Sequence, residues 1–137
     1  MGVMPGIDDK LSAPALRRGR LLVIDDDPMV ARSTVLALEE DHDCVSAPGG
    51  REALALIDKG ERFDVILCDL TMPFMSGMEV YREMLRRSPE LAAKMLFVTG
   101  VAFSDEAREF SAQHPDAFLI KPFSMDQLLA IIRARLA

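Results

Sequence analysis

Residues 21–28 read Leu-Leu-Val-Ile-Asp-Asp-Asp-Pro, a stretch that changes abruptly from apolar to acidic. Four consecutive apolar residues predict a short strand that is covered on both faces of a sheet. Carboxylates followed by proline predict the start of a helix, because a carboxylate caps free backbone N–H groups and proline fits the first helical turn. The stretch therefore predicts a buried strand that leads directly into a helix.

The same alternation between strand and helix patterns continues along the chain. Strands are predicted at 21–24, 44–47, 65–68, 95–98 and 118–120, and helices at 28–40, 49–60, 77–87, 105–113 and 124–136. Strands that alternate with helices predict a parallel sheet with right-handed crossovers and helices on both faces. We expect an α/β fold with a doubly wound sheet of five parallel strands.

Composition and charge exclude several classes of function. The chain has 137 residues and a formal net charge of −6, with 50% apolar and 28% charged residues, the balance of one soluble globular domain. An acidic domain repels nucleic-acid phosphates, and the basic clusters at 17–20 and 86–87 are too short to offset this. No run approaches the roughly 18 apolar residues of a membrane span, and the start lacks a signal peptide pattern. We expect a cytoplasmic protein that neither binds nucleic acid directly nor inserts into a membrane.

The N-terminal segment differs from the rest of the chain. Residues 1–18 contain glycine and proline without sustained periodicity, which predicts a flexible tail or linker before a domain at 19–137. Cys44 and Cys68 lie in apolar runs and are expected to be buried, reduced thiols.

Polar residues follow four of the five predicted strands. They are Asp25, Asp26 and Asp27 after the first strand, Asp69 after the third, Thr99 after the fourth and Lys121 after the fifth. Each of them alone also suits an ordinary turn, cap or strand exit. Ligands of doubly wound sheets bind outside the carboxyl ends of the strands, so the set as a whole indicates a binding site there.

The chemistry of this set points to a phosphoryl group. Two carboxylates about 4 Å apart repel by roughly 4 kcal/mol at an effective dielectric constant of about 20, so a carboxylate cluster favours a bound cation. Oxygen ligands suit a hard ion such as Mg²⁺ or Mn²⁺. An aspartate can attack phosphorus, while an ammonium group and a hydroxyl bind phosphoryl oxygens.

At these positions the chain resembles bacterial two-component receiver domains, over about residues 20–136. The matching segments are Leu21 to Pro28, Asp64 to Pro73 continuing to Gly77, Val98-Thr99-Gly100 and Lys121-Pro122-Phe123. The resemblance implies a flavodoxin-like (βα)5 fold in three α/β/α layers with strand order 2-1-3-4-5. Gly100 and the pair His114-Pro115 look more like the C-terminal receivers of hybrid sensor histidine kinases.

The resemblance also assigns roles at the site. Asp69 is implied as the phospho-acceptor, and Asp25 and Asp26 as the acidic pair that holds Mg²⁺ together with Asp69 and the backbone carbonyl of Thr71. Thr99 resembles the switch hydroxyl, and Lys121 the lysine that pairs with the phosphoryl group.

Two further positions keep alternatives open. Phe118 occupies the place of the switch aromatic, and it also suits a plain core phenylalanine. Asp27 suits either a third acidic site residue or the helix cap before Pro28.

The implied function is a phosphorylation-dependent signalling switch. Asp69 would accept a phosphoryl group from the phosphohistidine of a sensor histidine kinase or a histidine phosphotransfer protein. The change of conformation is expected at the face of helix 105–113, strand 118–120 and helix 124–136, through which many receivers form homodimers. The chain is expected to be no enzyme, apart from catalysing its own phosphotransfer and autodephosphorylation. The autodephosphorylation is expected to be slow, because Thr71 and Val101 flank the path of the attacking water in this family and the apolar Val101 would not orient it.

Two other functions stay open. A phosphohydrolase of the haloacid dehalogenase type also uses a strand-end aspartate, but its second aspartate two residues later is Thr71 here. A degenerate receiver would act as a non-phosphorylated interaction module. Such domains usually lack a member of the set that is complete here.

Overall fold

The structure is a computed structural model that describes residues 17–100 and 104–137. The strands are β1 (Arg20–Ile24), β2 (Asp43–Ala47), β3 (Val65–Asp69), β4 (Met95–Thr99) and β5 (Phe118–Ile120). The helices are α2 (Pro28–Leu38), α3 (Gly50–Asp58), α4 (Gly77–Arg87), α5 (Pro89–Ala92), α6 (Asp105–Gln113) and α7 (Met125–Leu136), with a 3-10 turn η1 (Pro115–Ala117). No described helix is long and apolar enough to cross a membrane.

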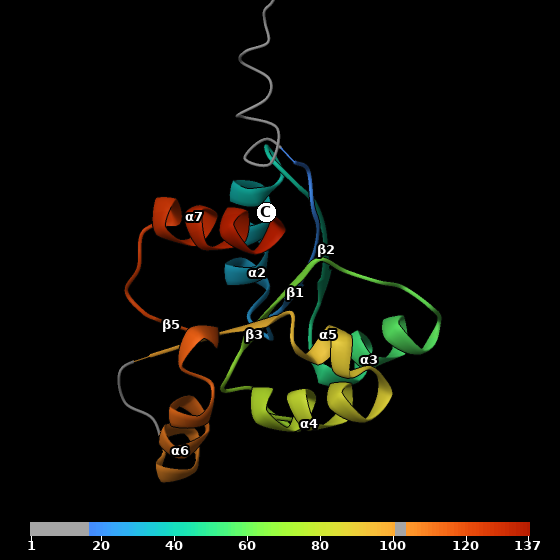
Figure 1. The fold of residues 1–137 in the computed structure, drawn as a ribbon, viewed down its shortest axis with the longest axis vertical. Helices are drawn as coiled ribbons and strands as arrows, with labels where there is room; N and C mark the ends of the chain where they lie inside the picture. Colours follow the sequence, from blue (N-terminus) through green and yellow to red (C-terminus); the bar gives the residue numbers. More distant parts are fainter. Residues whose placement is uncertain (1–16, 101–103) are drawn as a thin grey trace, which may run out of the picture.

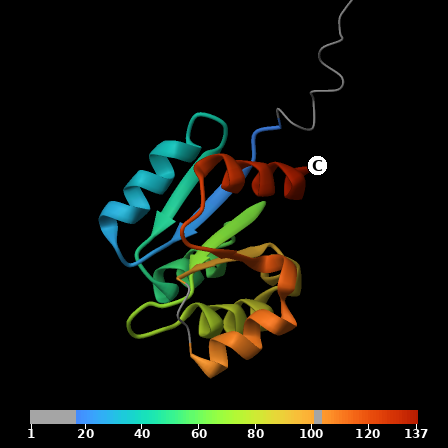
Figure 2. The same ribbon diagram turned by 90° about the vertical axis from the view of Figure 1, so that its left-hand side faces the viewer.

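The five strands form one parallel sheet in the order β2-β1-β3-β4-β5. Helices α2 and α7 cover one face, and α3, α4, α5 and α6 cover the other (Figures 1 and 2). Alternate residues of each strand point to opposite faces, so every inner strand contributes to two cores. Leu21 and Val23 pack toward α7, whereas Leu22 and Ile24 pack toward α3 and α4. The predicted fold and strand order are confirmed.

Local signals in the sequence explain where the helices begin. The Asp27 carboxylate accepts hydrogen bonds from the backbone N–H groups of Met29 and Val30, and Pro28 occupies the first turn of α2. Asp27 therefore serves as the helix cap, one of the two roles left open. Ser76 and Glu79 form a reciprocal capping box at the start of α4.

Two short elements were not predicted from the sequence. Helix α5 has four residues and begins at Pro89 after the capping hydroxyl of Ser88, and η1 has three residues. Segments this short cannot show a helical period, and only α5 has a capping side chain that could signal it.

The first two described residues, Arg17 and Arg18, form hydrogen bonds at the ends of two helices. Arg18 donates hydrogen bonds to the carbonyl oxygens of Glu39, Glu40 and His42 beyond the end of α2, and it pairs with Asp43 at 2.9 Å. Arg17 donates to the Leu136 carbonyl in α7. Both arginines belong to the segment predicted as a tail, and their side chains contact the domain.

Candidate functional site

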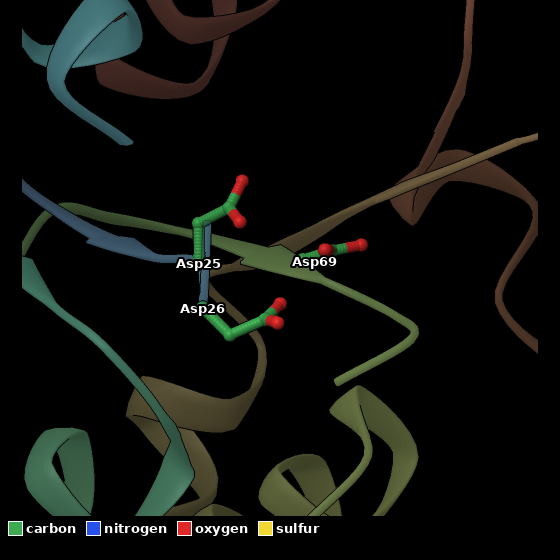
Figure 3. A group of neighbouring side chains, drawn as sticks. All are labelled: Asp25, Asp26 and Asp69. Atoms are coloured by element: carbon green, nitrogen blue, oxygen red, sulfur yellow. The ribbon is translucent and has the colours of Figure 1, made fainter. Parts of the chain in front are cut away.

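Three aspartates meet at the carboxyl ends of β1 and β3. Ile24 pairs with Cys68 in the register of these neighbouring strands, so Asp25 and Asp69 follow at the same level. One carboxylate oxygen from each of Asp25, Asp26 and Asp69 lies within 4.8 Å of the others. Figure 3 shows the three side chains projecting from the two strand ends. The structure thus brings together the carboxylates that the sequence analysis singled out.

The surroundings of Asp25 and Asp69 disfavour the charged forms of these two carboxyl groups. Burial raises the pKa of Asp69, and the nearby charge of Asp25 raises it further. A long hydrogen bond from the Thr71 N–H to Asp69 Oδ1, at 3.4 Å, and the charge of Lys121 act in the opposite direction. Burial likewise raises the pKa of Asp25, against a 2.9 Å hydrogen bond from the Asp27 N–H. Half-buried carboxylates with raised pKa values gain stability when a cation joins them.

The donor set fits a hard divalent cation. All three side chains offer carboxylate oxygens, the ligands that Mg²⁺ and Mn²⁺ prefer. Cys68 lies directly beside Asp69, but its side chain is buried and its Sγ contacts the Asp69 carbonyl oxygen at 3.3 Å. Burial raises the pKa of the Cys68 thiol far above its usual range, so it offers no thiolate. The site therefore lacks the soft ligand that would favour zinc.

Thr99 and Lys121 lie at the carboxyl ends of the next two strands, Thr99 as the last residue of β4 and Lys121 directly after β5. Thr99 ends β4 and is 3% exposed, and its carbonyl oxygen accepts a 2.8 Å hydrogen bond from the Lys121 N–H. The Lys121 side chain lines a small cavity of about 50 Å³ together with Asp25 and Asp69, between α2 and α7. Lys121 therefore lies close to Asp25 and Asp69, and Thr99 lies at the carboxyl end of the strand next to β3.

Phe118 lies away from the carboxylates, in a cluster of aromatic rings. Its ring is 5.3 Å from that of Phe97 and 5.8 Å from that of Phe110. Tyr81 joins the same cluster from α4, with its ring 5.4 Å from Phe110 and 4.9 Å from His114. Phe118 is therefore packed among other rings, as a core phenylalanine would be. It also lies on β5, next to the strand that carries Thr99, as a switch aromatic would.

The sequence analysis did not predict the roles of two residues near the site. A third residue, for which it made a prediction, lies outside the part of the chain that the structure describes. Gly77 packs against the end of β3, where a Cβ atom would be 2.7 Å from the Asp69 carbonyl oxygen. Phe74 lies in the connection after Asp69 with its side chain exposed. A glycine or an exposed aromatic gives no periodic signal in one sequence. Val101, on which the expectation of slow autodephosphorylation depended, lies outside the described residues.

Comparison with known proteins identifies the family. The model of the response regulator receiver domain matches residues 21–133. The chain belongs to this family. The receiver domain of two-component response regulators accounts for the sheet order and for the acidic cluster at its edge.

Curated relatives contain this receiver domain as one part of a longer protein. The chain is 33% identical over 118 residues to the sensor kinase CckA of Brucella abortus, covering 85% of this chain and 12% of that protein. It is 33% identical over 116 residues to the transcriptional regulatory protein TcrA of Mycobacterium tuberculosis, covering 84% of this chain and 45% of TcrA. The chain therefore spans less than half the length of both relatives.

Solved structures show the same receiver fold. A CheY-like response regulator receiver domain protein of Methanospirillum hungatei superposes with a TM-score of 0.76 at 34% identity, covering 88% of this chain and 94% of that one. The receiver domain of the Francisella response regulator 1452 superposes with a TM-score of 0.73 at 27% identity, covering 87% and 97%.

Proposed function

We propose that this receiver domain is a phosphorylation-dependent switch in which Asp69 accepts a phosphoryl group from a phosphohistidine. The donor is a sensor histidine kinase or a histidine phosphotransfer protein in the cytoplasm. The observation that carries the proposal is the approach of Asp25, Asp26 and Asp69 to within 4.8 Å, with Thr99 at the end of β4 and Lys121 directly after β5.

The carboxylates define where a cation would be held. Asp25, Asp26, Asp69 and the backbone carbonyl of Thr71 would hold Mg²⁺ or Mn²⁺. When bound, the ion supplies positive charge that neutralises phosphoryl oxygens.

Asp69, Lys121 and Thr99 carry out the phosphoryl transfer. A carboxylate oxygen of Asp69 attacks phosphorus, and an O–P bond forms as the N–P bond to the donor imidazole breaks. The electron pair of the broken bond returns to the imidazole nitrogen, and the ring leaves as neutral histidine when its other nitrogen carries a proton. Lys121 binds a phosphoryl oxygen through its ammonium group, and Thr99 donates its hydroxyl hydrogen to another.

Thr99 connects the site to the rest of the fold. Its side chain is buried at the end of β4, and we expect its hydroxyl to move toward the phosphoryl group when Asp69 is phosphorylated. Phe97 pairs with Phe118 in the register of β4 and β5, so this movement reaches Phe118 through adjoining strands. The output face is formed by α6, β5 and α7, where Ile120 exposes an apolar side chain. This face would bind the output partner or a second copy of the chain.

Incubation with acetyl phosphate and MgCl₂, followed by intact-mass measurement, tests the proposal. The wild-type chain should gain one phosphoryl group, Asp69→Asn should gain none, and Asp41→Asn, an exposed acid beyond the end of α2, should behave as wild type. A wild-type chain without an adduct would identify a degenerate receiver. Turnover of a phosphomonoester would identify a phosphohydrolase instead.

A further inference from the structure

The connection between β3 and α4 presents one aromatic side chain to solvent. Phe74 is 98% exposed, whereas Leu70 and Met72 of the same connection are buried. The connection is held by hydrogen bonds from the Gly77 N–H to the Leu70 carbonyl at 2.8 Å and from the Met75 N–H to the Pro73 carbonyl at 2.7 Å. Phe74 is thus displayed by a well-anchored segment.

The backbone of Phe74 is unfavourable for a phenylalanine. Its φ is 70°, in the left-handed region, and the Met75-to-Pro73 hydrogen bond closes a γ-type turn around it. Glycine occupies this conformation without steric cost, whereas a side chain with a Cβ is strained there. Phe74 therefore adds strain to the connection, and its exposed ring buries no surface in return. Stability of the domain does not explain the residue.

The position of Phe74 relates it to the phosphoryl-acceptor site. Phe74 and Asp26 line the same hollow of about 420 Å³, between the β2–α3 and β3–α4 connections. Beyond the β1–α2 connection, which carries Asp25 and Asp26, Met29 lies in the first turn of α2 and is 78% exposed. Three of the six exposed large apolar side chains among the described residues therefore lie close in sequence to the carboxylates, one on the β3–α4 connection and two in the first turn of α2. They are Met29, Val30 and Phe74.

We infer that Phe74 is a docking residue that recognises the protein donor of the phosphoryl group. This inference rests on the proposed function. A donor histidine must place its phosphorus within about 3–3.5 Å of an Asp69 oxygen. A folded donor that does so also covers the connections around Asp69, and with them the hollow shared by Asp26 and Phe74. An exposed aromatic ring that becomes buried in this way is the kind of residue that dominates binding at interfaces.

A small phosphodonor provides the contrast. Acetyl phosphate has no surface that could reach Phe74 while it reacts at Asp69. Loss of the ring should therefore slow transfer from a protein and leave the reaction with acetyl phosphate unchanged. A purely structural role of Phe74 would change both reactions together.

Phosphotransfer from autophosphorylated histidine kinase cores, purified away from ATP, tests the inference. A panel of such cores is screened on the wild-type chain, and the fastest donor is used for all variants. Phe74→Ala and Phe74→Gly should each lower kcat/KM for this donor by about tenfold or more, as expected for loss of an interface hot spot. The rate of labelling by acetyl phosphate should stay at the wild-type value. Leu85→Ala removes an exposed apolar side chain from α4, 43% exposed, and should change neither rate.

Three outcomes would overturn the inference. Both Phe74 variants could retain the wild-type rate with the kinase, or they could lose the kinase and acetyl phosphate reactions equally. The wild-type chain could also react with acetyl phosphate but with no kinase core. A wild-type chain that fails to react with acetyl phosphate would contradict the proposed function itself. The two failures are therefore distinguishable.

Discussion

A Cβ atom on Gly77 would lie 2.7 Å from the backbone carbonyl oxygen of Asp69. The same atom would be 2.9 Å from the Cα atom of Leu70, so backbone surrounds Gly77 on this side. The first residue of α4 thereby fixes the end of β3, which carries the proposed phospho-acceptor. This contact links the packing of a helix terminus directly to the position of the reacting carboxylate.

Gly77→Ala should therefore damage both stability and the site. The methyl group cannot fit without displacing the backbone of Asp69 or Leu70, and overpacking of this kind costs about 1–3 kcal/mol. Urea denaturation should show this loss, and labelling by acetyl phosphate should be slower. Gly100→Ala is the matched control, because a Cβ atom there meets no atom of the described residues within 4 Å beyond its chain neighbours. Equal stability of the two variants would contradict the close contact.

Mg²⁺ should stabilise the domain against heat. The three clustered carboxylates repel one another without a cation, and a ligand at 100 times its Kd adds about 2.7 kcal/mol to the folded state. Thermal unfolding with and without MgCl₂ measures this gain. Asp26→Asn should reduce the gain and make the metal-free protein more stable, since it removes one of the repelling charges. Asp41→Asn should retain the full gain in thermal stability that Mg²⁺ gives the wild type. If wild type, Asp26→Asn and Asp41→Asn all gained equally, the cation would bind at another place.

Tyr81 should report phosphorylation optically. It is the single tyrosine in a chain without tryptophan, and its ring lies in the cluster that contains Phe110 and His114. Phe118 packs against Phe110, so a change at Phe118 alters the packing around Tyr81. Acetyl phosphate with Mg²⁺ should change the tyrosine fluorescence of the wild-type chain. Asp69→Asn should show no change. If the wild-type fluorescence stayed constant despite a confirmed phosphoryl adduct, the aromatic cluster around Tyr81 would not respond to phosphorylation.

His42 should make stability depend on pH. Its side chain is 5% exposed, and its Nδ1 accepts a 3.1 Å hydrogen bond from the Gly19 N–H. Burial lowers the pKa of His42 below the ordinary value of 6.5; Arg18 and Arg133 also lower it, while Asp41 and Asp43 oppose the shift. The neutral ring therefore stabilises the fold fully above about pH 6.5, and this contribution is lost as the pH falls through the lowered pKa.

His42→Asn tests this pH dependence, because the amide oxygen can replace Nδ1 as acceptor and does not titrate. Free energies of unfolding from urea titrations between about pH 7.5 and pH 5.5 should fall more steeply for wild type than for the variant. One proton accounts for at most about 1.4 kcal/mol per pH unit. Parallel curves would show that the protonation of His42 is not linked to folding.

Much of the fold follows from local features of the sequence. The apolar run 21–24 and the cap-and-proline start at Asp27 and Pro28 predict β1 and α2, because strand burial and helix capping depend on neighbouring residues. The polar residues after four of the five strands predict a site at one sheet edge, because parallel strands end on the same side. The family resemblance adds the strand order and the roles proposed for Asp69, Thr99 and Lys121.

Only the tertiary structure decided the alternatives and the close contacts that the sequence left open. Asp27 proved to be the helix cap because its backbone turns its carboxylate toward the N–H groups of Met29 and Val30. The exposure of Phe74 follows from the turn around it, and the fit of Gly77 against Asp69 follows from the docking of α4 on β3. Residue patterns specify which side chains reach the sheet edge. Register, loop backbone and helix docking specify how close those side chains come to one another, because these depend on the packing of the whole domain.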